Sequence, residues 1–263
     1  QHMSTPRPAE IAHRDARRMA VVLGEIGGEG APISGGWMSL DVPGSWANFA
    51  AGLGVHGPVD RVEVDRLVSF YRAQGASPRI EVTPFQDPTL RPRLEEQNFT
   101  GTDDERVLVH GLKVGPPSES PRGLSFRTID GSREVDVKGF IESQMLGFFP
   151  DEVAPAGMYP ITERLARHPR CTLWLIESDG LIVGSGGVEF FEETAVLIAG
   201  CVYPSAQRRG VQSAFINYRL SYARFQGARY ATIASVVGGP TERNALRAGF
   251  SSAYTQTMLK QAP

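Results

Sequence analysis

The sequence predicts an α+β protein built from two domains with a similar order of elements. Stretches with helical apolar spacing alternate with short apolar runs that are typical of strands. Two segments about 150 residues apart repeat in register. Residues 114–123, VGPPSESPRG, form a Pro-, Ser- and Gly-rich linker between the two halves. At 263 residues, the chain is long enough for two domains of about 130 residues each.

In the first half, helices and strands alternate. The clearest helix covers residues 58–74, where Val64, Leu67 and Tyr71 repeat at helical spacing and Gly75 marks the end. The other predicted helices cover 9–24 and 88–96, and the predicted strands cover 37–42, 79–83 and 107–110.

The second half contains more strands than the first. Asp179-Gly180 separates two apolar runs, which predicts an antiparallel hairpin of 171–177 with 181–189. Further strands are predicted at 124–128, 195–202, 230–236 and 253–259, and helices at 133–149, 161–168, 211–226 and 240–248.

A repeated pattern relates the two halves. Gln74 and Gln226 each precede a Gly-Ala pair and a strand, and they lie 152 residues apart. Phe99 and Phe250 each follow the next short helix, and they lie 151 residues apart. Because the register holds across both segments, the sequence indicates a duplication.

Composition excludes several classes of protein. A net charge of −2 provides no overall basic field for nucleic acid, and no apolar run approaches the ~18 residues of a membrane span. The start resembles no secretory signal, and Gln1-His2 before Met3 is typical of a cloning remnant. Cys171 and Cys201 lie in apolar runs, which favours buried thiols in a cytoplasmic protein over a disulfide. The five histidines have no metal-ligand spacing.

The most informative stretch is 195–215. An apolar strand, 195–202, ends at Tyr203-Pro204 and is followed by a polar segment, 205–210, here called the basic loop, and then by a helix. Backbone N–H groups at a helix start are unpaired and carry a partial positive charge, and Arg208 and Arg209 add full charges. This pattern predicts a site for a phosphate-bearing ligand, with a solvated turn that caps a helix as the alternative.

This loop and a second motif resemble those of a known family. QRRGVQSA, residues 207–214, resembles the acetyl-CoA loop of the GNAT N-acetyltransferase superfamily, in which Gln/Arg-x-x-Gly-x-Gly/Ala follows a strand. Gln207 and Gly210 match, whereas Gln212 replaces a small residue and is expected to project sideways. RNALRAGF, residues 243–250, is similar to the second motif of the family, a short helix that ends in Gly-Phe.

The resemblance covers residues 123–260 and implies two GNAT-like domains. Each would be a mixed, mostly antiparallel sheet flanked by helices, with only the C-terminal domain complete, as in tandem-GNAT proteins. The expected boundaries are 3–113 for a degenerate domain, 114–123 for a linker and 124–263 for the catalytic, acetyl-CoA-binding domain. The first half has no basic loop, because residues 50–54 read AAGLG, so it is not expected to bind coenzyme A.

The resemblance also implies a set of coenzyme-binding residues. In this family the fourth and fifth strands splay apart, commonly at a bulge, and pantetheine lies between them. Acetyl-CoA is the expected co-substrate, with no metal. The expected coenzyme-binding residues are Cys201, Val202, Tyr203, Gln207, Arg208, Arg209, Gly210, Val211, Gln212, Ser213, Asn244 and Arg247.

The catalytic acid and base are less well marked. Family members often use a Tyr four residues before the Gly of the second motif, but that position is Ala245 here. Tyr254, on the last strand, is the substitute acid that we consider, with a packed aromatic residue as the alternative. Glu193, in an acidic turn, is the candidate base, with a solvated surface as the alternative.

Together these features predict an acetyl-CoA-dependent N-acetyltransferase. The expected acceptor is a primary amine of a small molecule or peptide, which attacks the thioester directly. No nucleic acid or membrane partner is expected, and the chain would be a monomer or homodimer. The alternative function is a non-catalytic acyl-CoA-binding or sensing module. A dinucleotide site at residues 184–187, GSGG, is excluded because a strand rather than a helix follows it.

Overall fold

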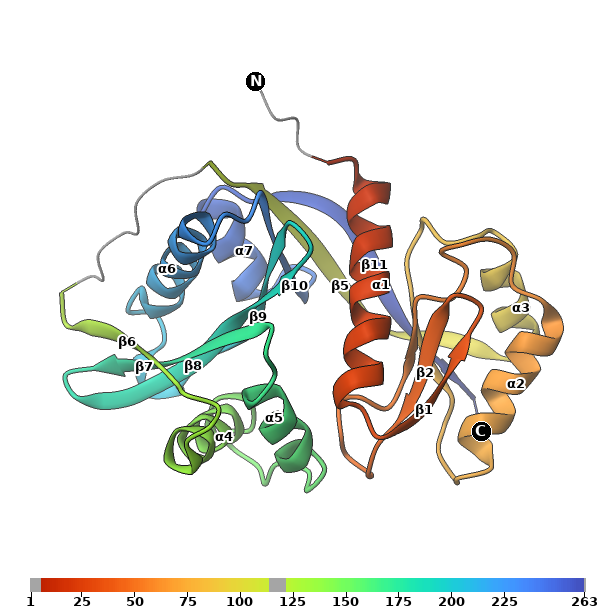
Figure 1. Ribbon diagram of the computed structural model, residues 1–263, viewed down its shortest axis with the longest axis horizontal. Coiled ribbons are helices and arrows are strands. Elements are labelled where there is room, and N and C mark those ends of the chain that lie inside the picture. The colour runs from red at the N-terminus through yellow and green to blue at the C-terminus, as the bar shows by residue number, and fades with distance from the viewer. Residues whose placement is uncertain (1–5, 114–121, 263) are drawn as a thin grey trace. The chain divides into compact units, whose positions relative to one another are not determined.

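The computed structural model describes residues 6–113 and 122–262, which form two compact units (Figure 1). The first unit contains Gln1–Arg106 and Ala253–Pro263, and the second contains Val107–Ser252. Of the predicted linker, 114–123, only the last two residues lie within the described part of the chain. Residues 1–3, interpreted above as a cloning remnant and start, lie outside it.

In the second unit, one sheet lies between two pairs of helices. The sheet has the order β5-β10-β9-β8-β7-β6, with β10 parallel to β9 and antiparallel pairing from β9 to β6. Helices α4 and α5 cover one face, and α6 and α7 cover the other (Figure 1). The elements are β6 (Leu124–Thr128), α4 (Glu134–Phe148), α5 (Met158–Ala166), β7 (Cys171–Ser178), β8 (Leu181–Phe191), β9 (Thr194–Val202), α6 (Val211–Phe225), β10 (Tyr230–Val236), α7 (Pro240–Arg247) and the end of β5 (Phe99–Gly111).

In the first unit, the helix and strand order of the second half is repeated in reduced form. Its sheet has the order β1-β2-β3-β4-β11-β5, and β3 is only two residues long. The elements are α1 (Pro8–Ile26), β1 (Glu29–Ile33), β2 (Gly36–Leu40), β3 (Ala50–Ala51), α2 (Arg61–Arg72), β4 (Arg79–Val82), α3 (Leu90–Glu96), the start of β5 and β11 (Ser251–Gln261).

The last strand of each half belongs to the sheet of the other half. β11 pairs antiparallel with β4, from Thr257 opposite Val82 to Lys260 opposite Arg79. The end of β5 neighbours β10 instead, and its Leu108 joins the core of the second unit. The observed units therefore differ from the predicted division at 113 and 124, which assigned each half its own last strand.

The core of the second unit explains why its strands read as continuous apolar runs. One cluster, with Trp174 and Phe215, lies between the sheet and α6. Another, with Phe140 and Leu175, lies between the sheet and α4. Since both faces of β7 to β9 are covered, residues on both sides of each strand are buried and the alternation of polar and apolar residues disappears.

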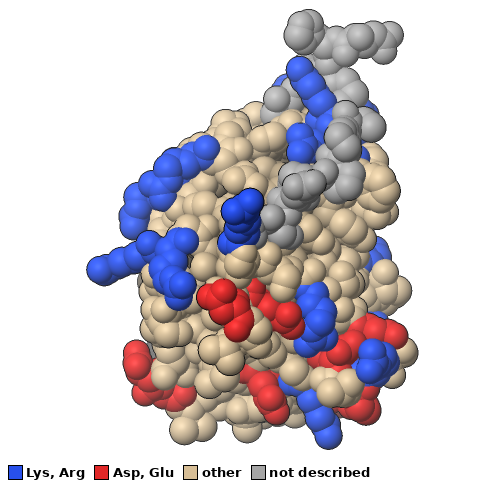
Figure 2. All heavy atoms as spheres, turned by 90° about the vertical axis from the view of Figure 1, so that its left-hand side faces the viewer, with Lys and Arg blue, Asp and Glu red and all other residues tan. Residues whose placement is uncertain are grey.

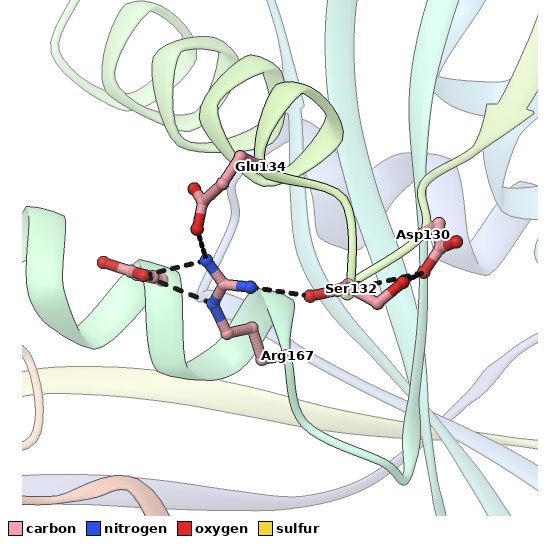
Figure 3. A network of polar contacts seen from close by, with 6 residues as sticks. Asp130, Ser132, Glu134 and Arg167 are labelled. Atoms are coloured by element: carbon pink, nitrogen blue, oxygen red, sulfur yellow. Dashed lines mark hydrogen bonds and ion pairs between the residues drawn. The ribbon is translucent and has the colours of Figure 1, made fainter.

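An ion-pair network joins the start of α4 to α5 (Figure 3). The Arg167 guanidinium lies 2.5 Å from the Glu134 carboxylate and 3.0 Å from that of Glu163, and it donates to the Gly131 carbonyl at 2.9 Å. These groups are partly exposed, so each pair adds little stability alone. Their shared guanidinium nevertheless fixes the loop before α4 against α5.

Candidate functional site

A gap opens between two neighbouring parallel strands of the second unit. β9 and β10 pair from Thr194 opposite Tyr230 to Leu197 opposite Ile233. Beyond that point β9 bulges, because Gly187 is opposite Ile198 but Ser185 is opposite Cys201. A bulge bends its strand and increases its twist, so β9 turns away from β10. We call this opening the strand gap.

The ladder on the other edge of β9 shows which backbone groups face the strand gap. The Tyr203 N–H donates to the Val183 carbonyl of β8 at 2.8 Å, so it is not available to a ligand in the gap. N–H groups alternate between the two edges of a strand, so the Val202 N–H points toward the gap. Of Val202 and Tyr203, both predicted to bind the coenzyme, Val202 is therefore the one whose backbone donor faces the strand gap.

The basic loop leads into α6 through two left-handed residues. Arg208 has φ 60°, and Gly210, the N-cap of α6, has φ 78°. A side chain at Gly210 would meet no atom within 4 Å, so its glycine is required by conformation rather than by space. The first intrahelical bond runs from Ala214 to Gly210 at 2.9 Å, which leaves the N–H groups before Ala214 without helix partners. Residues 211–213, which carry these donors, line the same pocket as the exposed Arg208.

The strand gap and the basic loop open into one pocket of about 630 Å³. Its size is in the usual range for ligand sites, about 300–1,000 Å³. Ten of the twelve predicted coenzyme-binding residues line it, while Tyr203 and Arg209 do not. The ten are Cys201, Val202, Gln207, Arg208, Gly210, Val211, Gln212, Ser213, Asn244 and Arg247.

Several pocket residues are not among those predicted to bind the coenzyme. Gly147 and Phe148 come from α4, and a side chain at Gly147 would lie 2.3 Å from the Cys201 sulfur, so helix and strand touch there. No local sequence pattern reports that long-range contact. The remaining unpredicted residues are Gly200, Ala206, Pro240, Thr241 and Arg243.

Gln212, which departs from the family pattern, projects sideways as predicted. Its Nε2 donates to Thr241 Oγ1 at 2.7 Å, and its Oε1 accepts a hydrogen bond from Asn244. Asn244 in turn accepts from Arg247. The side chain thereby leaves the backbone N–H groups uncovered and ties the start of α6 to α7.

Cys201 is a buried thiol at the wall of the pocket. Its sulfur lies 3.4 Å from Ser185 Oγ and 3.6 Å from Gln144 Nε2. Burial raises the pKa of the Cys201 thiol, so it stays protonated at neutral pH and is a poor nucleophile. Cys201 and the half-buried Cys171 are both free thiols.

Glu193, the predicted base, lies at the opposite end of β9 from the pocket. It precedes the strand, and Cys201 lies eight residues further on. At about 3.3 Å per residue, that separation is roughly 26 Å. Its carboxylate pairs with Arg229 at 2.6 Å, and it does not line the pocket. The geometry therefore places Glu193 far from the pocket.

We accordingly predict that Glu193→Gln leaves the affinity for coenzyme A and the turnover within about twofold of the parent chain. The substitution weakens one partly exposed ion pair, which is worth at most about 1 kcal/mol. Calorimetry with coenzyme A and a thiol-release assay would check both values. A turnover loss of tenfold or more at unchanged affinity would restore Glu193 as the base.

Tyr254, the predicted acid, belongs to the first unit through the exchanged strand β11. It is 5% exposed, and its hydroxyl donates to Asp15 at 3.0 Å. Burial, with the nearby Asp15 carboxylate, raises the pKa of Tyr254 well above its usual value. It does not line the pocket. Ala245 occupies the position of the usual acid of the family. It is fully buried in the core cluster of Trp174 and Phe215, so its side chain faces away from the pocket.

In the described residues of the first unit, the turn and helix start that correspond to the basic loop are closed and acidic. After β3, the Gly54 N–H donates to Ser34 at 3.2 Å and its carbonyl accepts from Asp87 at 2.8 Å, so the turn is closed. The start of α2 carries Asp60 as N-cap and Glu63 in its first turn. Negative charge there disfavours phosphate. These contacts support the expectation that only the second unit binds coenzyme A.

Charges are unevenly distributed over the surface. On the face drawn in Figure 2, Lys and Arg occupy the upper part, while Asp and Glu lie lower among further basic side chains. Over the described ranges 6–113 and 122–262, no cluster of three or more potential metal ligands occurs. No helix within these ranges has the length and apolar character needed to cross a membrane.

Comparison with known proteins agrees with this geometry. The model of the acetyltransferase (GNAT) family matches residues 140–250. No protein among those with curated functions matches the chain. Among solved structures, a GCN5-related N-acetyltransferase from Kribbella flavida is 16% identical with a TM-score of 0.66, over 94% of this chain and 96% of that one.

Two other solved structures cover nearly the whole chain. A conserved protein of unknown function from Staphylococcus epidermidis is 11% identical with a TM-score of 0.59, over 89% of this chain and 94% of that one. A tandem GNAT protein from the clavulanic acid biosynthesis pathway is 13% identical with a TM-score of 0.58, over 97% and 96%. Residues 140–250 thus match the model of the GNAT acetyltransferase family, within a two-unit fold similar to that of a tandem GNAT protein.

Proposed function

We propose that the second unit binds acetyl-CoA and transfers its acetyl group to a primary amine of a small molecule or peptide. The observation that carries this proposal is the meeting of the strand gap and the basic loop in one pocket. The N–H groups at the start of α6, together with Arg208, suit a pyrophosphate. The gap beside Val202 suits an extended pantetheine chain, with the thioester near the bulge.

The reaction would proceed by direct attack of the neutral amine on the thioester carbonyl. The Val202 N–H would donate to the carbonyl oxygen as negative charge develops on it. The carbon–sulfur bond then breaks, and the coenzyme thiolate takes up a proton. None of the residues found to line the pocket is Asp, Glu, His or Tyr, so water or the acceptor would relay the protons. Cys171 and Cys201, neither of which forms a disulfide, fit the reducing cytoplasm, where we place this reaction.

Calorimetry with coenzyme A, run beside a thiol-release screen of primary amines with acetyl-CoA, tests the proposal. We expect saturable binding of one coenzyme per chain, and thiol release that depends on the added amine. Absence of coenzyme A binding would overturn the proposed site.

A non-catalytic acyl-CoA sensor is the second candidate. The absence of an acid or base side chain among the pocket-lining residues favours it. The two functions differ in one measurement: a sensor binds coenzyme A without amine-dependent thiol release across a broad panel of amines.

A further inference from the structure

Arg219, on α6, is a buried cation at the bulge of β9. It is 2% exposed. Its Nη1 donates to the carbonyls of Gly187 at 3.2 Å and Ile198 at 3.4 Å, and its guanidinium carbon lies 4.2 Å from the centre of the Phe215 ring. No Asp or Glu in the described part of the chain pairs with it.

A buried charge with no opposite charge is costly to fold. Removing an ion from water costs several kcal/mol, and hydrogen bonds to neutral carbonyls repay only part of that cost. Burial lowers the pKa of Arg219 to about 9, which still leaves the side chain charged at neutral pH. The fold thus maintains a positive charge here at the expense of stability.

The surrounding glycines place this charge directly behind the pocket wall. A side chain at Gly200 would come within 3.2 Å of Arg219 Nη2, and Gly200 itself lines the pocket. Gly186, opposite the bulge, has equally little room, since a side chain there would lie 2.8 Å from Phe215. The guanidinium therefore lies one backbone layer from the strand gap.

We propose that Arg219 is a positioning residue for the thioester. The positive charge of Arg219 would stabilise the oxyanion across the backbone of the bulge. This inference rests on the proposed acetyl transfer. Donation to the Ile198 carbonyl holds the guanidinium against the bulge that precedes Val202, and an unscreened charge acts strongly across a low-dielectric interior. As the amine nitrogen bonds to the carbonyl carbon, negative charge builds on the oxygen. The oxygen electron pair then re-forms the carbonyl double bond as the carbon–sulfur bond breaks, and the leaving thiolate takes up a proton while the attacking nitrogen loses one through water.

A purely structural role makes a different prediction. If Arg219 only satisfied the Gly187 and Ile198 carbonyls, its loss would distort the strand gap. Coenzyme affinity and turnover would then fall together, and a neutral donor would serve as well as a charged one. Charge is the property that separates the two roles.

The test compares Arg219→Gln, which keeps donors without charge, with Arg219→Lys, which keeps the charge. Arg219→Met adds a variant without donor or charge, and Arg229→Met is the control, because Arg229 lies at the other end of β9. Each is assayed for coenzyme A affinity, for kcat with the amine found by thiol release, and for the carbonyl stretch of bound acetyl-CoA labelled with carbon-13.

We expect Arg219→Gln and Arg219→Met to bind coenzyme A within about threefold of the parent but to lose about tenfold or more in kcat. The labelled carbonyl should shift toward its frequency in free acetyl-CoA, while Arg219→Lys and Arg229→Met should stay near the parent. Two outcomes would overturn the proposal. One is an unchanged carbonyl stretching frequency and kcat in Arg219→Gln. The other is an equal loss of affinity and kcat in both Arg219→Gln and Arg219→Lys. If Arg219→Met does not fold, Arg219→Gln decides alone. A parent chain that fails to bind coenzyme A would instead refute the proposed function.

Discussion

A fragment of residues 124–263 is expected not to form a stable coenzyme-binding unit. This fragment lacks the end of β5, whose Val107, Leu108 and Val109 are buried, as is Leu112 just beyond it. Each buried aliphatic side chain contributes about 1.5–3 kcal/mol, so the four together contribute roughly 6–12 kcal/mol. That range is comparable with the whole stability of a typical domain, about 5–15 kcal/mol.

The fragment would also keep a strand that has lost its neighbours. β11 lies between β4 and β5 in the full chain, and neither would be present. An unpaired strand exposes its backbone donors and acceptors and promotes aggregation. We therefore expect the fragment to be aggregated or to lack a cooperative melting transition.

Residues 107–252 provide the matched comparison, because they include the end of β5 and omit all but the first two residues of β11. We expect this fragment to melt cooperatively and to bind coenzyme A. Circular dichroism melts and calorimetry on both fragments and the full chain would test the pair. A 124–263 fragment that melts cooperatively and binds coenzyme A with the affinity of the full chain would show that strand exchange is dispensable.

The exchange of the last strands, β5 and β11, between the two sheets could not be predicted from the sequence. The individual strands were readable, since apolar runs such as 195–202 are typical of a strand covered on both faces. Pairing of β11 with β4 joins residues about 175 positions apart, and equivalent strands of a duplicated chain offer the same pattern to either sheet. Local spacing carries no information on that choice. The prediction of Tyr254 as the acid requires its strand to belong to the second unit, whereas Tyr254 lies in the first.

The coenzyme loop was predictable because its chemistry is local. Gly210 is needed at a left-handed N-cap, and the helix start follows it directly in sequence. The bulge was expected only from the family resemblance, since Ala199 adopts φ 52° without a glycine to mark it. The position of Glu193 relative to the basic loop is also readable from the sequence: it precedes strand 195–202, while the basic loop follows that strand, so the two lie at opposite ends.

Reversing the charge of the basic loop is expected to weaken coenzyme A binding strongly. Arg208 and Arg209 form no ion pair within the described residues, so both charges are available to a bound anion. Arg208→Glu with Arg209→Glu should weaken binding at least about tenfold, or about 1.4 kcal/mol, because each substitution replaces attraction to the pyrophosphate with repulsion. Calorimetry at low salt would measure the loss, which should shrink as added salt screens these exposed charges.

The structure also predicts how the loss divides between the two positions. Arg208 lines the pocket and Arg209 does not, so Arg208→Glu alone should account for most of the effect. Arg133→Glu with Lys138→Glu is the control, since both residues are exposed on the second unit outside the pocket and the charge change is the same. Equal losses in the control would mean that net charge, rather than the basic loop, governs binding. An unchanged affinity in the loop variant would remove the loop from the site, since its N–H groups and arginines face the same anion.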